Sequence, residues 1–360
     1  MKNLNVNRRS FIKGSSALAI TAAMNQFSFA STTVAPNLVG ISVASYWLRF
    51  RDGGNEKYPQ WKGAYEMAKH CQEIGAGGAQ VSISKWDMDY AKKMRKLVEQ
   101  TGMWLEGSIS LPKEENELAA FDKALAASKE AGIEIIRAPC LHGRRYMSFK
   151  TKEEWLQFKK QAMKSIRLSE AVARKNGVKI AIENHKDWTA DELVGIMKSF
   201  DSPHLGVNLD TGNNLSFLED PYEVVDKLAP YALTTHFKDM GIERYPDGFL
   251  LSEVPYGQGF LDLNRMMMRL RKHKPDIKFN LEMMTRDPLE IPYLTDSYWQ
   301  TFDDRLGKDL SGSLRILREN YADNPLPRVE QKSHVEQLAD EEDNQLACLD
   351  FAKSSLQIMG

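Results

Sequence analysis

The chain has 360 residues, enough for one barrel or for two ordinary domains with a sizeable core. Its 48 Lys and Arg residues almost balance its 49 Asp and Glu residues, so the net charge at pH 7 is -1. No overall positive field therefore attracts the protein to nucleic acid or to an anionic membrane, which weighs against a DNA-repair role. The three cysteines contain no C-x-x-C pair, so we expect packed thiols and a fold that does not depend on disulfides.

The first thirty residues have the features of an export signal. Residues 7–13, Asn-Arg-Arg-Ser-Phe-Ile-Lys, precede a modestly apolar run at 17–24 and a small-x-small site at 28–30, which together resemble a twin-arginine signal. The apolar run is too short to span a membrane. We predict a signal peptide over 1–30, a mature protein that begins near Ser31, and a periplasmic or otherwise exported location. An uncleaved amphipathic N-terminus is the alternative.

The remainder of the chain alternates between short apolar runs and helix-like segments. Runs without polar alternation are typical of strands covered on both faces. The predicted strands are residues 38–46, 75–84, 103–110, 133–143, 178–185, 205–213, 232–239 and 277–284. The predicted helices are residues 61–74, 89–101, 115–131, 155–176, 189–200, 220–228 and 263–273. This order predicts a parallel sheet with crossover helices, and the absence of a linker favours one barrel with extensions.

Two long segments follow the last strands. Residues 241–260 form a predicted loop with a turn at 245–248, and residues 286–306 are rich in Pro, Tyr and Trp. Long loops on the catalytic face of a barrel commonly build the substrate pocket. The aromatic residues of these loops either stack on a second sugar or an aglycone, or only seal the loops over the barrel; they are Trp47, Tyr245, Tyr256, Tyr293, Tyr298 and Trp299.

The C-terminal part of the chain has one helical pattern from Leu310 onward and then an acidic end. We assign residues 31–320 to the barrel and 321–360 to a C-terminal extension that is partly mobile. The run Asp-Glu-Glu-Asp at 340–343 is expected to be a solvated face.

Metal-competent residues terminate four successive predicted strands. They are Glu183, Asp210, His236 and Glu282, each placed where an apolar run ends. Active groups of a parallel barrel gather at the carboxyl ends of its strands, so we expect these four side chains to converge. Three carboxylates and one imidazole suit Mn²⁺, Mg²⁺ or Co²⁺, and Zn²⁺ also accepts them. We predict one divalent metal, with Mn²⁺ preferred; four separate surface or salt-bridged residues are the alternative.

The motifs E-N-H, L-D-T-G-N, H-F-K-D and G-Q-G around these residues resemble the xylose-isomerase-like superfamily. Its members include ketose 3-epimerases, hydroxypyruvate isomerases, inosose dehydratases and the endonuclease IV group. The resemblance covers about residues 39–285 and implies an α/β fold: a (β/α)8 TIM barrel, here with long catalytic-face loops and a C-terminal helical extension. It also implies that Glu183 and Glu282 are the catalytic acid-base pair, while Asp210 and His236 mainly hold the metal.

The chain departs from these families at two places. Ketose 3-epimerases have a His three residues after the metal Asp, where this chain has Asn213. The endonuclease IV pattern has an Asp-x-His pair before its G-x-G, where this chain has Ser-Glu-Val-Pro-Tyr at 252–256. A three-metal cluster does not fit that pattern, so we expect one metal.

Two residues that follow the predicted ligands are candidates for substrate binding. His185 lies two residues after Glu183, and Lys238 lies two residues after His236, so each should project on the same strand face as the ligand. His185 would contact the substrate or act as a general acid, and a packed loop histidine is the alternative. Lys238 would neutralise enediolate charge, and a salt bridge to Asp239 or Glu183 is the alternative.

Three further residues complete the predicted substrate-binding set. Arg137 and His142 end the fourth predicted strand and could reach substrate hydroxyls, and Asn213 replaces the family histidine. An interior ion pair is the alternative for Arg137, and an exposed loop position is the alternative for His142.

A dication beside a sugar can hold a carbonyl oxygen and the neighbouring hydroxyl, which stabilises the enediolate formed when the carbon loses its proton. We therefore predict an exported, divalent-metal-dependent sugar isomerase or epimerase for an unphosphorylated carbohydrate. The close alternative is a lyase or dehydratase that acts on a keto-sugar or 3-keto-glycoside. Two further alternatives, an abasic-site endonuclease and a non-catalytic sugar-binding barrel, are less favoured. The expected partner is a small carbohydrate, not nucleic acid or, after signal cleavage, a membrane; homo-oligomerisation stays open.

Overall fold

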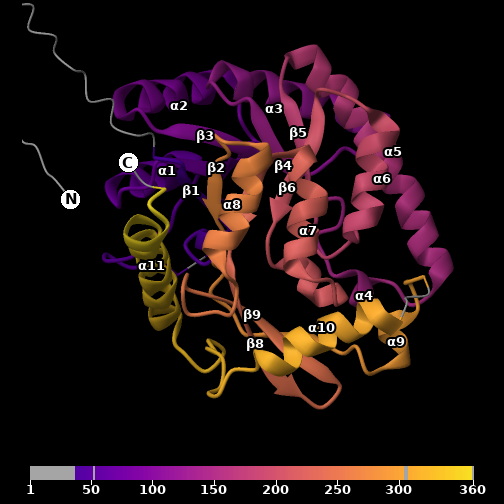
Figure 1. Cartoon of the computed structure of the whole chain (residues 1–360). Coiled ribbons are helices and arrows are strands. Elements are labelled where there is room, and N and C mark those ends of the chain that lie inside the picture. Colours follow the sequence, from indigo (N-terminus) through magenta and orange to yellow (C-terminus); the bar gives the residue numbers. More distant parts are fainter. Residues whose placement is uncertain (1–36, 52, 304–306, 359–360) are drawn as a thin grey trace, which may run out of the picture. The chain divides into compact units, whose positions relative to one another are not determined.

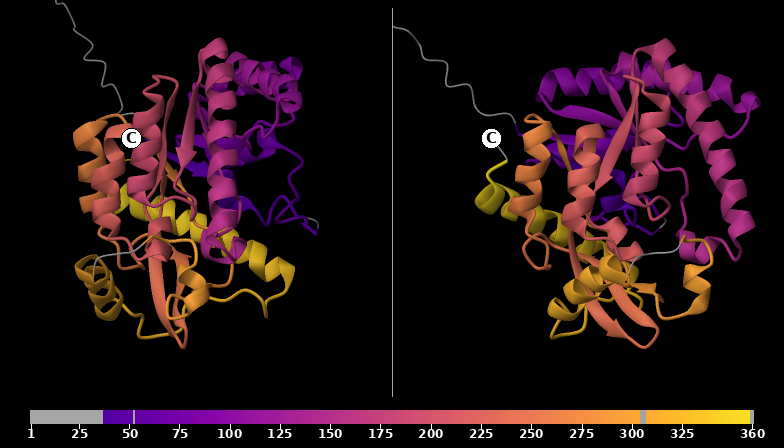
Figure 2. Two further views of the ribbon diagram at one scale, coloured as in Figure 1. Left: turned by 90° about the vertical axis from the view of Figure 1, so that its right-hand side faces the viewer. Right: turned by 45° about the vertical axis from the view of Figure 1, so that its right-hand side comes forward.

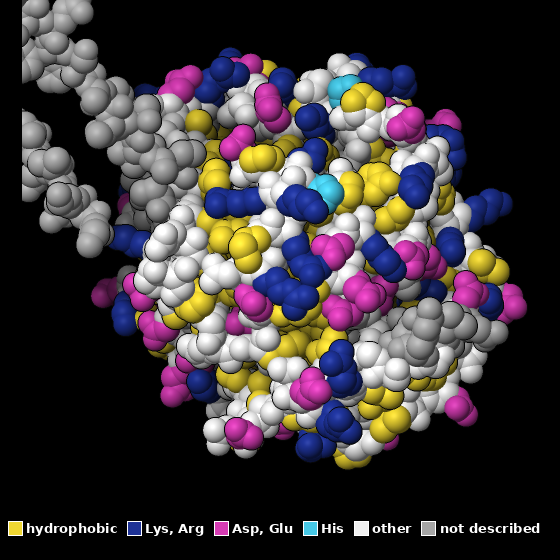
Figure 3. All heavy atoms as spheres, viewed as in Figure 1, with side chains coloured by type: hydrophobic (Ala, Val, Ile, Leu, Met, Phe, Trp, Pro, Cys, Tyr) yellow, Lys and Arg dark blue, Asp and Glu magenta, His cyan; other side chains and the backbone are white. Residues whose placement is uncertain are grey.

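The computed structural model describes residues 37–51, 53–303 and 307–358 (Figure 1). The predicted signal peptide, residues 1–30, lies outside these ranges. Within them, every helix is too short or too polar to cross a membrane. Basic and acidic side chains are interspersed on the face shown in Figure 3, in keeping with the nearly balanced composition.

Eight parallel strands in the described part of the chain close into a barrel, in the order β1-β10-β7-β6-β5-β4-β3-β2. They are β1 (Val39–Ser42), β2 (Gly78–Ser82), β3 (Trp104–Ser108), β4 (Ile135–Ala138), β5 (Lys179–Glu183), β6 (Leu205–Asp210), β7 (Ala232–Phe237) and β10 (Phe279–Leu281). The predicted (β/α)8 barrel is confirmed. The strands are shorter than the predicted segments, at one end or at both; residues 43–46 of the first predicted strand, for example, form a 3-10 helix.

Seven helices that follow the barrel strands pack on the outside of the barrel, within the described ranges (Figure 1). They are α1 (Ala64–Glu73), α2 (Met88–Thr101), α3 (Leu118–Glu130), α5 (Lys152–Asn176), α6 (Ala190–Phe200), α7 (Pro221–Leu228) and α8 (Leu263–His273). Thr189 and Glu192 form a capping box at the start of α6. Asp220 caps α7 ahead of Pro221, since a first-turn proline loses no helical hydrogen bond.

The segment 241–260 is not the long loop that the sequence suggests. β8 (Asp239–Tyr245) and β9 (Gly248–Val254) form an antiparallel hairpin, and β11 (Leu289–Ile291) pairs with β9. The predicted turn is confirmed, because Tyr245 pairs with Gly248. The strand arrows in Figure 2 run toward this hairpin and α10 (Gly307–Glu319), so both lie at the carboxyl end of the barrel.

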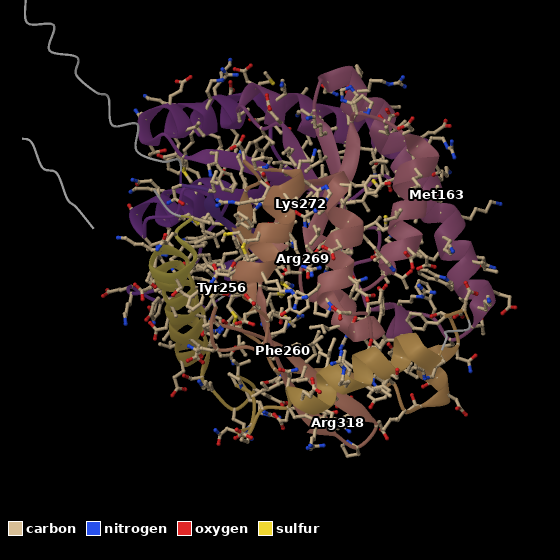
Figure 4. The ribbon with its side chains drawn as sticks, viewed as in Figure 1. Met163, Tyr256, Phe260, Arg269, Lys272 and Arg318 are labelled. Atoms are coloured by element: carbon tan, nitrogen blue, oxygen red, sulfur yellow. The ribbon has the colours of Figure 1, made fainter. Side chains whose placement is uncertain are left out.

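Two of the loop aromatics seal the structure and are not free to stack on a ligand. Tyr256, labelled in Figure 4, donates its hydroxyl to the Phe237 carbonyl at 2.8 Å, and its backbone N–H faces Cys348 Sγ. The Tyr298 hydroxyl donates to the Ser216 carbonyl at 2.6 Å. Both side chains are buried, so the sugar-stacking interpretation is wrong for them.

The acidic C-terminal run is part of α11 (His334–Phe351), which packs beside the start of the barrel (Figure 1). Glu341 is 0% exposed and accepts hydrogen bonds from the backbone N–H groups of Leu48 at 2.7 Å and Arg49 at 3.1 Å. Glu342 pairs with Arg49 and with His70. The expectation of a solvated acidic face is therefore wrong for these two glutamates, because each finds a partner on the loop after β1 or on α1.

Candidate metal centre

The four strand-end residues meet at the carboxyl end of the barrel. One potential ligand atom from each of Glu183, Asp210, His236 and Glu282 lies within 4.8 Å of the others, and all four side chains are buried. His236 Nδ1 is 3.0 Å from Glu183 Oε1 and 3.0 Å from Glu282 Oε1. The predicted convergence is confirmed, and the alternative of separate surface positions is wrong. The ion pairs of the salt-bridged alternative are present as well, because Glu183 pairs with Arg137, and Asp210 and Glu282 pair with Lys238.

A bulge between β6 and β7 brings Asp210 beside His236. Val207 pairs with Ala232, but the next residue of β6, Asn208, pairs with Thr234, so β7 contains one extra residue. Without the bulge, Asp210 would lie opposite Thr235, the neighbour of His236 that points to the other face of the strand. With it, Asp210 and His236 are direct partners in the sheet.

Gln80 fixes the tautomer of His236. Gln80 Oε1 lies 2.7 Å from His236 Nε2, and Gln80 Nε2 lies 3.4 Å from both Glu106 Oε2 and Asn208 Oδ1. Because the amide nitrogen faces two acceptors, the amide oxygen must face the imidazole, and His236 Nε2 must carry a proton. Nδ1 is thereby left as the ligand atom, directed at the two glutamates.

Replacing Gln80 with leucine is expected to lower metal affinity by about 10- to 100-fold, because the imidazole loses the partner that sets its tautomer and orientation. Titration of the metal-free protein with Mn²⁺ and Mg²⁺ measures this change. The Gln80→Glu variant retains an acceptor for the Nε2 proton and should retain most of the affinity. Equal loss in both variants would show that the side chain acts only through packing.

The cations around the site hold one oxygen of each glutamate and leave the other free for a metal. Arg137 Nε donates to Glu183 Oε2 at 2.6 Å, and Lys238 Nζ contacts Glu282 Oε2 and lies 2.8 Å from Asp210 Oδ2. The Oε1 atoms of both glutamates therefore face His236 Nδ1. This set of hard oxygen donors with one imidazole nitrogen fits one divalent ion.

The interior ion pair foreseen for Arg137 is observed, with Glu183 as its partner. The salt bridge foreseen for Lys238 has different partners, because its ammonium faces Asp210, Glu282 and Glu253. Asp239 instead accepts backbone N–H groups of the 257–261 segment, and it anchors that segment to the hairpin.

The carboxylates next to His236 control its proton. Burial alone would lower the pKa of His236, but Glu282 and Glu183 outweigh it and raise the pKa to about 9. The pKa of Glu183 is lowered despite its burial, because Arg137 and His236 stabilise the carboxylate. In the metal-free protein at neutral pH, Nδ1 therefore carries a proton that is shared between two carboxylates.

A divalent metal must displace that proton. Below pH 9 we expect about one proton released per metal bound and an affinity that rises about tenfold per pH unit, with both effects disappearing above the pKa of about 9. Calorimetric titration in two buffers of different ionisation enthalpy counts the protons. Metal binding without proton release at pH 7 would show that His236 is neutral in the metal-free site.

The remaining substrate-binding candidates differ in burial, and their roles stay predictions. His185 Nδ1 donates to the Leu141 carbonyl at 2.8 Å, and burial lowers the pKa of this imidazole to about 3, so it is neutral. His142 Nε2 lies 3.0 Å from Ser110 Oγ and is exposed, as in the alternative foreseen for it. Asn213 is fully buried, and its Nδ2 donates to the Asn184 carbonyl at 3.1 Å and to Glu183 Oε1 at 3.4 Å.

Several residues around the site were missed from the sequence. Gln80 and Glu106 belong to a polar layer inside the barrel, below the ligands, in which Thr234 and Asn280 also contact Glu106. Lys186 directly follows the E-N-H motif, which is the one signal that could have found it. The other missed residues are Tyr146, Glu253 and Arg286, and their segments carry no pattern that distinguishes them.

Comparisons with known proteins agree with this architecture. The family model described as xylose isomerase-like TIM barrel matches residues 68–300. The 3-oxo-isoapionate decarboxylase of Pectobacterium atrosepticum is 28% identical over 102 residues, which are 28% of this chain and 37% of that protein. The matches to two curated relatives span only 37% and 29% of their lengths, about a third.

Solved structures resemble the chain over most of its length. D-psicose 3-epimerase from Clostridium cellulolyticum H10 gives a TM-score of 0.53 at 16% identity, covering 78% of this chain and 98% of that one. The 3-keto-D-glucoside 4-epimerase of E. coli gives a TM-score of 0.52 at 14% identity, covering 78% of this chain and 99% of that one. These likenesses establish the fold only. Because the family match spans well over half of the chain, this protein belongs to the xylose isomerase-like TIM barrel family.

Proposed function

We propose that this protein is a divalent-metal-dependent enzyme that isomerises or epimerises a sugar by removing a proton from the carbon next to a carbonyl. The observation that supports this most directly is the position of Glu183 and Glu282, whose Oε1 atoms both lie 3.0 Å from His236 Nδ1. Two carboxylates thus flank the point where the ligand atoms converge. When bound there, a divalent ion supplies Lewis-acid polarisation of the substrate oxygens.

Residues of the chain then supply the acid-base groups and the charges that stabilise them. One glutamate takes the proton as the C–H bond breaks, and the other, which must first take up a proton from solvent because its own pKa is lowered, returns that proton on the opposite face of the carbon. Arg137 keeps Glu183 ionised, which a base requires, since it lowers the pKa of that carboxyl against the effect of burial. Lys238 contributes a positive charge beside Glu282 and Asp210, where negative charge develops on the substrate.

A lyase is the second candidate, because the same proton abstraction can expel a leaving group. The relative over 102 residues is named a decarboxylase, and decarboxylation also leaves electrons on the carbon next to a carbonyl. The released product distinguishes the two kinds of lyase: elimination from a 3-keto-glycoside releases the aglycone, whereas decarboxylation releases CO₂.

Incubation of the metal-loaded protein with keto-sugars, keto-sugar acids and 3-keto-glycosides in D₂O tests the proposal. Deuterium in a rearranged sugar supports an isomerase or epimerase, and release of aglycone or CO₂ identifies a lyase. Exchange should stop after chelation and in the Glu183→Gln variant. Absence of metal-dependent exchange and of product across the panel would refute the proposal.

We also propose that the protein is exported through the twin-arginine route, with Mn²⁺ as its metal. Arg8 and Arg9 within residues 7–13, followed by the apolar run, support the export proposal. Replacing both arginines with lysine is expected to retain the full-length precursor in the cytoplasm, as measured by cell fractionation. Unchanged fractionation would refute this route. Metal analysis of protein purified from its own host tests the choice of Mn²⁺.

A further inference from the structure

Three cationic side chains come from segments at the carboxyl end of the barrel, close to one additional carboxylate. Lys186 follows β5, Lys238 joins β7 to β8, and Arg286 follows β10. We call Lys186, Lys238 and Arg286 the cationic cluster, and Glu253 of β9 lies beside two of its members.

Contacts between these residues show that they share one region. Arg286 Nη2 lies 2.7 Å from Glu253 Oε1, and Lys238 Nζ lies 3.5 Å from the same oxygen. Burial opposes ionisation of Glu253, but Arg286 and Lys238 lower its pKa to about 2, so it is fully charged. Glu253 is therefore paired with Arg286 and Lys238, and Lys238 is also paired with Asp210 and Glu282.

Within the described ranges, Lys186 forms no ion pair with a carboxylate. Its ammonium donates to Asn213 Oδ1, and Lys238 Nζ lies 3.4 Å from the same amide oxygen. Across the described ranges, no carboxylate lies within the 4 Å of an ion pair with Lys186. Both ammonium groups thus converge on one neutral acceptor, and whereas Lys238 is neutralised by Asp210, Glu282 and Glu253, the charge of Lys186 has no carboxylate beside it.

The burial of Lys186 makes this arrangement costly. The side chain is only 4% exposed, and burial, Lys238 and Arg286 together lower its pKa to about 8. Its backbone φ is +64°, a conformation that residues with a Cβ adopt rarely. The fold thus holds a largely charged amine in a buried position without a counterion, which is typical of a ligand-binding group.

Tyr146 adds an unused donor to the same region. It is 4% exposed, and no described residue accepts its hydroxyl proton. Burial raises the pKa of Tyr146 to about 12, and Arg144, Arg286 and Glu253 are among the charges that act on it. A buried hydroxyl without an acceptor, close to Arg286 and to the unpaired Lys186 ammonium, indicates an anionic acceptor supplied by a ligand.

We propose that the cationic cluster and Tyr146 bind a carboxylate of the substrate, so that the enzyme acts on a keto-sugar acid; this rests on the proposed function. Lys238 belongs both to the cluster and to the surroundings of Asp210 and Glu282. The anionic group is therefore close to the reacting carbons. A carboxylate on the carbon chain can lie close to the reacting carbons, whereas a phosphate on the terminal hydroxyl of a six-carbon sugar lies farther from them.

Calorimetric titration of the metal-loaded protein with gluconate, glucitol and glucose 6-phosphate tests this. Gluconate and glucitol differ at the acid group, so the comparison isolates the carboxylate. We expect gluconate to bind at least tenfold more tightly than glucitol and glucose 6-phosphate. The Lys186→Met variant should lose at least tenfold in gluconate affinity and change glucitol affinity less than twofold. Lys186→Arg should retain the preference.

The Lys85→Met variant is the matched control, because Lys85 is an exposed lysine on the loop after β2 at the same end of the barrel. It should bind all three probes as the unmodified protein does, and melting curves of every variant verify folding. Equal affinity for gluconate and glucitol, preference for glucose 6-phosphate, or equal loss of gluconate and glucitol in Lys186→Met would each overturn the proposal.

These measurements distinguish a failure of the acid-binding proposal from a failure of the proposed reaction. A preference for gluconate without proton exchange on any keto-sugar would support the acid-binding cluster and refute the proposed reaction. Exchange on neutral keto-sugars without a preference for gluconate would support the reaction and refute the cluster.

Discussion

Replacing Glu282 with glutamine is expected to slow proton exchange at the sugar by about 10²- to 10⁴-fold, the usual contribution of a positioned acid-base group. The amide keeps the shape of the side chain but cannot accept the proton. It also removes one of the two carboxylates that raise the pKa of His236 to about 9. Deuterium incorporation at saturating metal measures the loss, and a parallel metal titration separates weaker metal binding from slower chemistry.

Glu106→Gln is the matched control for this variant. Glu106 is also buried inside the barrel, and burial raises its pKa. Its Oε2 accepts from Thr234 at 2.7 Å and Asn280 at 2.8 Å, while its Oε1 has no hydrogen-bond partner within the described chain. A glutamine can place its amide oxygen where Oε2 lies and its amide nitrogen where Oε1 lies. We therefore expect the rate of proton exchange to change by less than tenfold. Equal losses in the two variants would attribute the Glu282 effect to damage of the barrel interior.

Replacing Leu349 with alanine is expected to destabilise the protein by about 2–5 kcal/mol, the cost of truncating a buried leucine. Leu349 is 4% exposed and belongs to the main hydrophobic core, although it lies in α11, far outside the barrel strands in sequence. In a protein of this size, the melting temperature should fall by roughly 3–7 °C. Thermal unfolding followed by circular dichroism measures the shift.

Leu346→Ala serves as the comparison, since Leu346 lies on the same helix and is 42% exposed. We expect its effect on the free energy of unfolding to be within about 0.5 kcal/mol of zero. If the two variants were equally stable, α11 would not be part of the cooperative unit. The helix also reaches the catalytic end, because Gln345 Nε2 donates to the Met283 carbonyl at 2.9 Å, next to Glu282. Loss of α11 packing should therefore lower activity as well as stability.

The hairpin of β8 and β9 has one feature that the local sequence predicts and one that depends on tertiary structure. The turn Tyr-Pro-Asp-Gly at 245–248 could be predicted, because proline and glycine restrict the backbone locally. The pairing of β9 with β11 could not, since nothing local specifies which distant segment supplies the third strand. As a result, Glu253 was missed, although it lies beside Lys238.

The acidic run of α11 shows a similar limit. Composition alone favours solvent for residues 340–343, yet Glu341 lies buried against the backbone N–H groups of Leu48 and Arg49, 293 and 292 residues away in the chain. The partners are main-chain groups that carry no side-chain pattern. Their availability depends on how the loop after β1 is folded, and only the assembled structure supplies that information.

The sequence by itself determined the barrel and the identity of the four candidate ligands. Both follow from short-range patterns, since apolar runs define buried strands and the polar residue that ends each run must lie at the carboxyl end of the sheet. The tertiary structure decided what surrounds those ligands: the bulge that pairs Asp210 with His236, the amide of Gln80 that sets the imidazole tautomer, and the buried ammonium of Lys186. These depend on register, orientation and burial, which arise only when distant segments pack together.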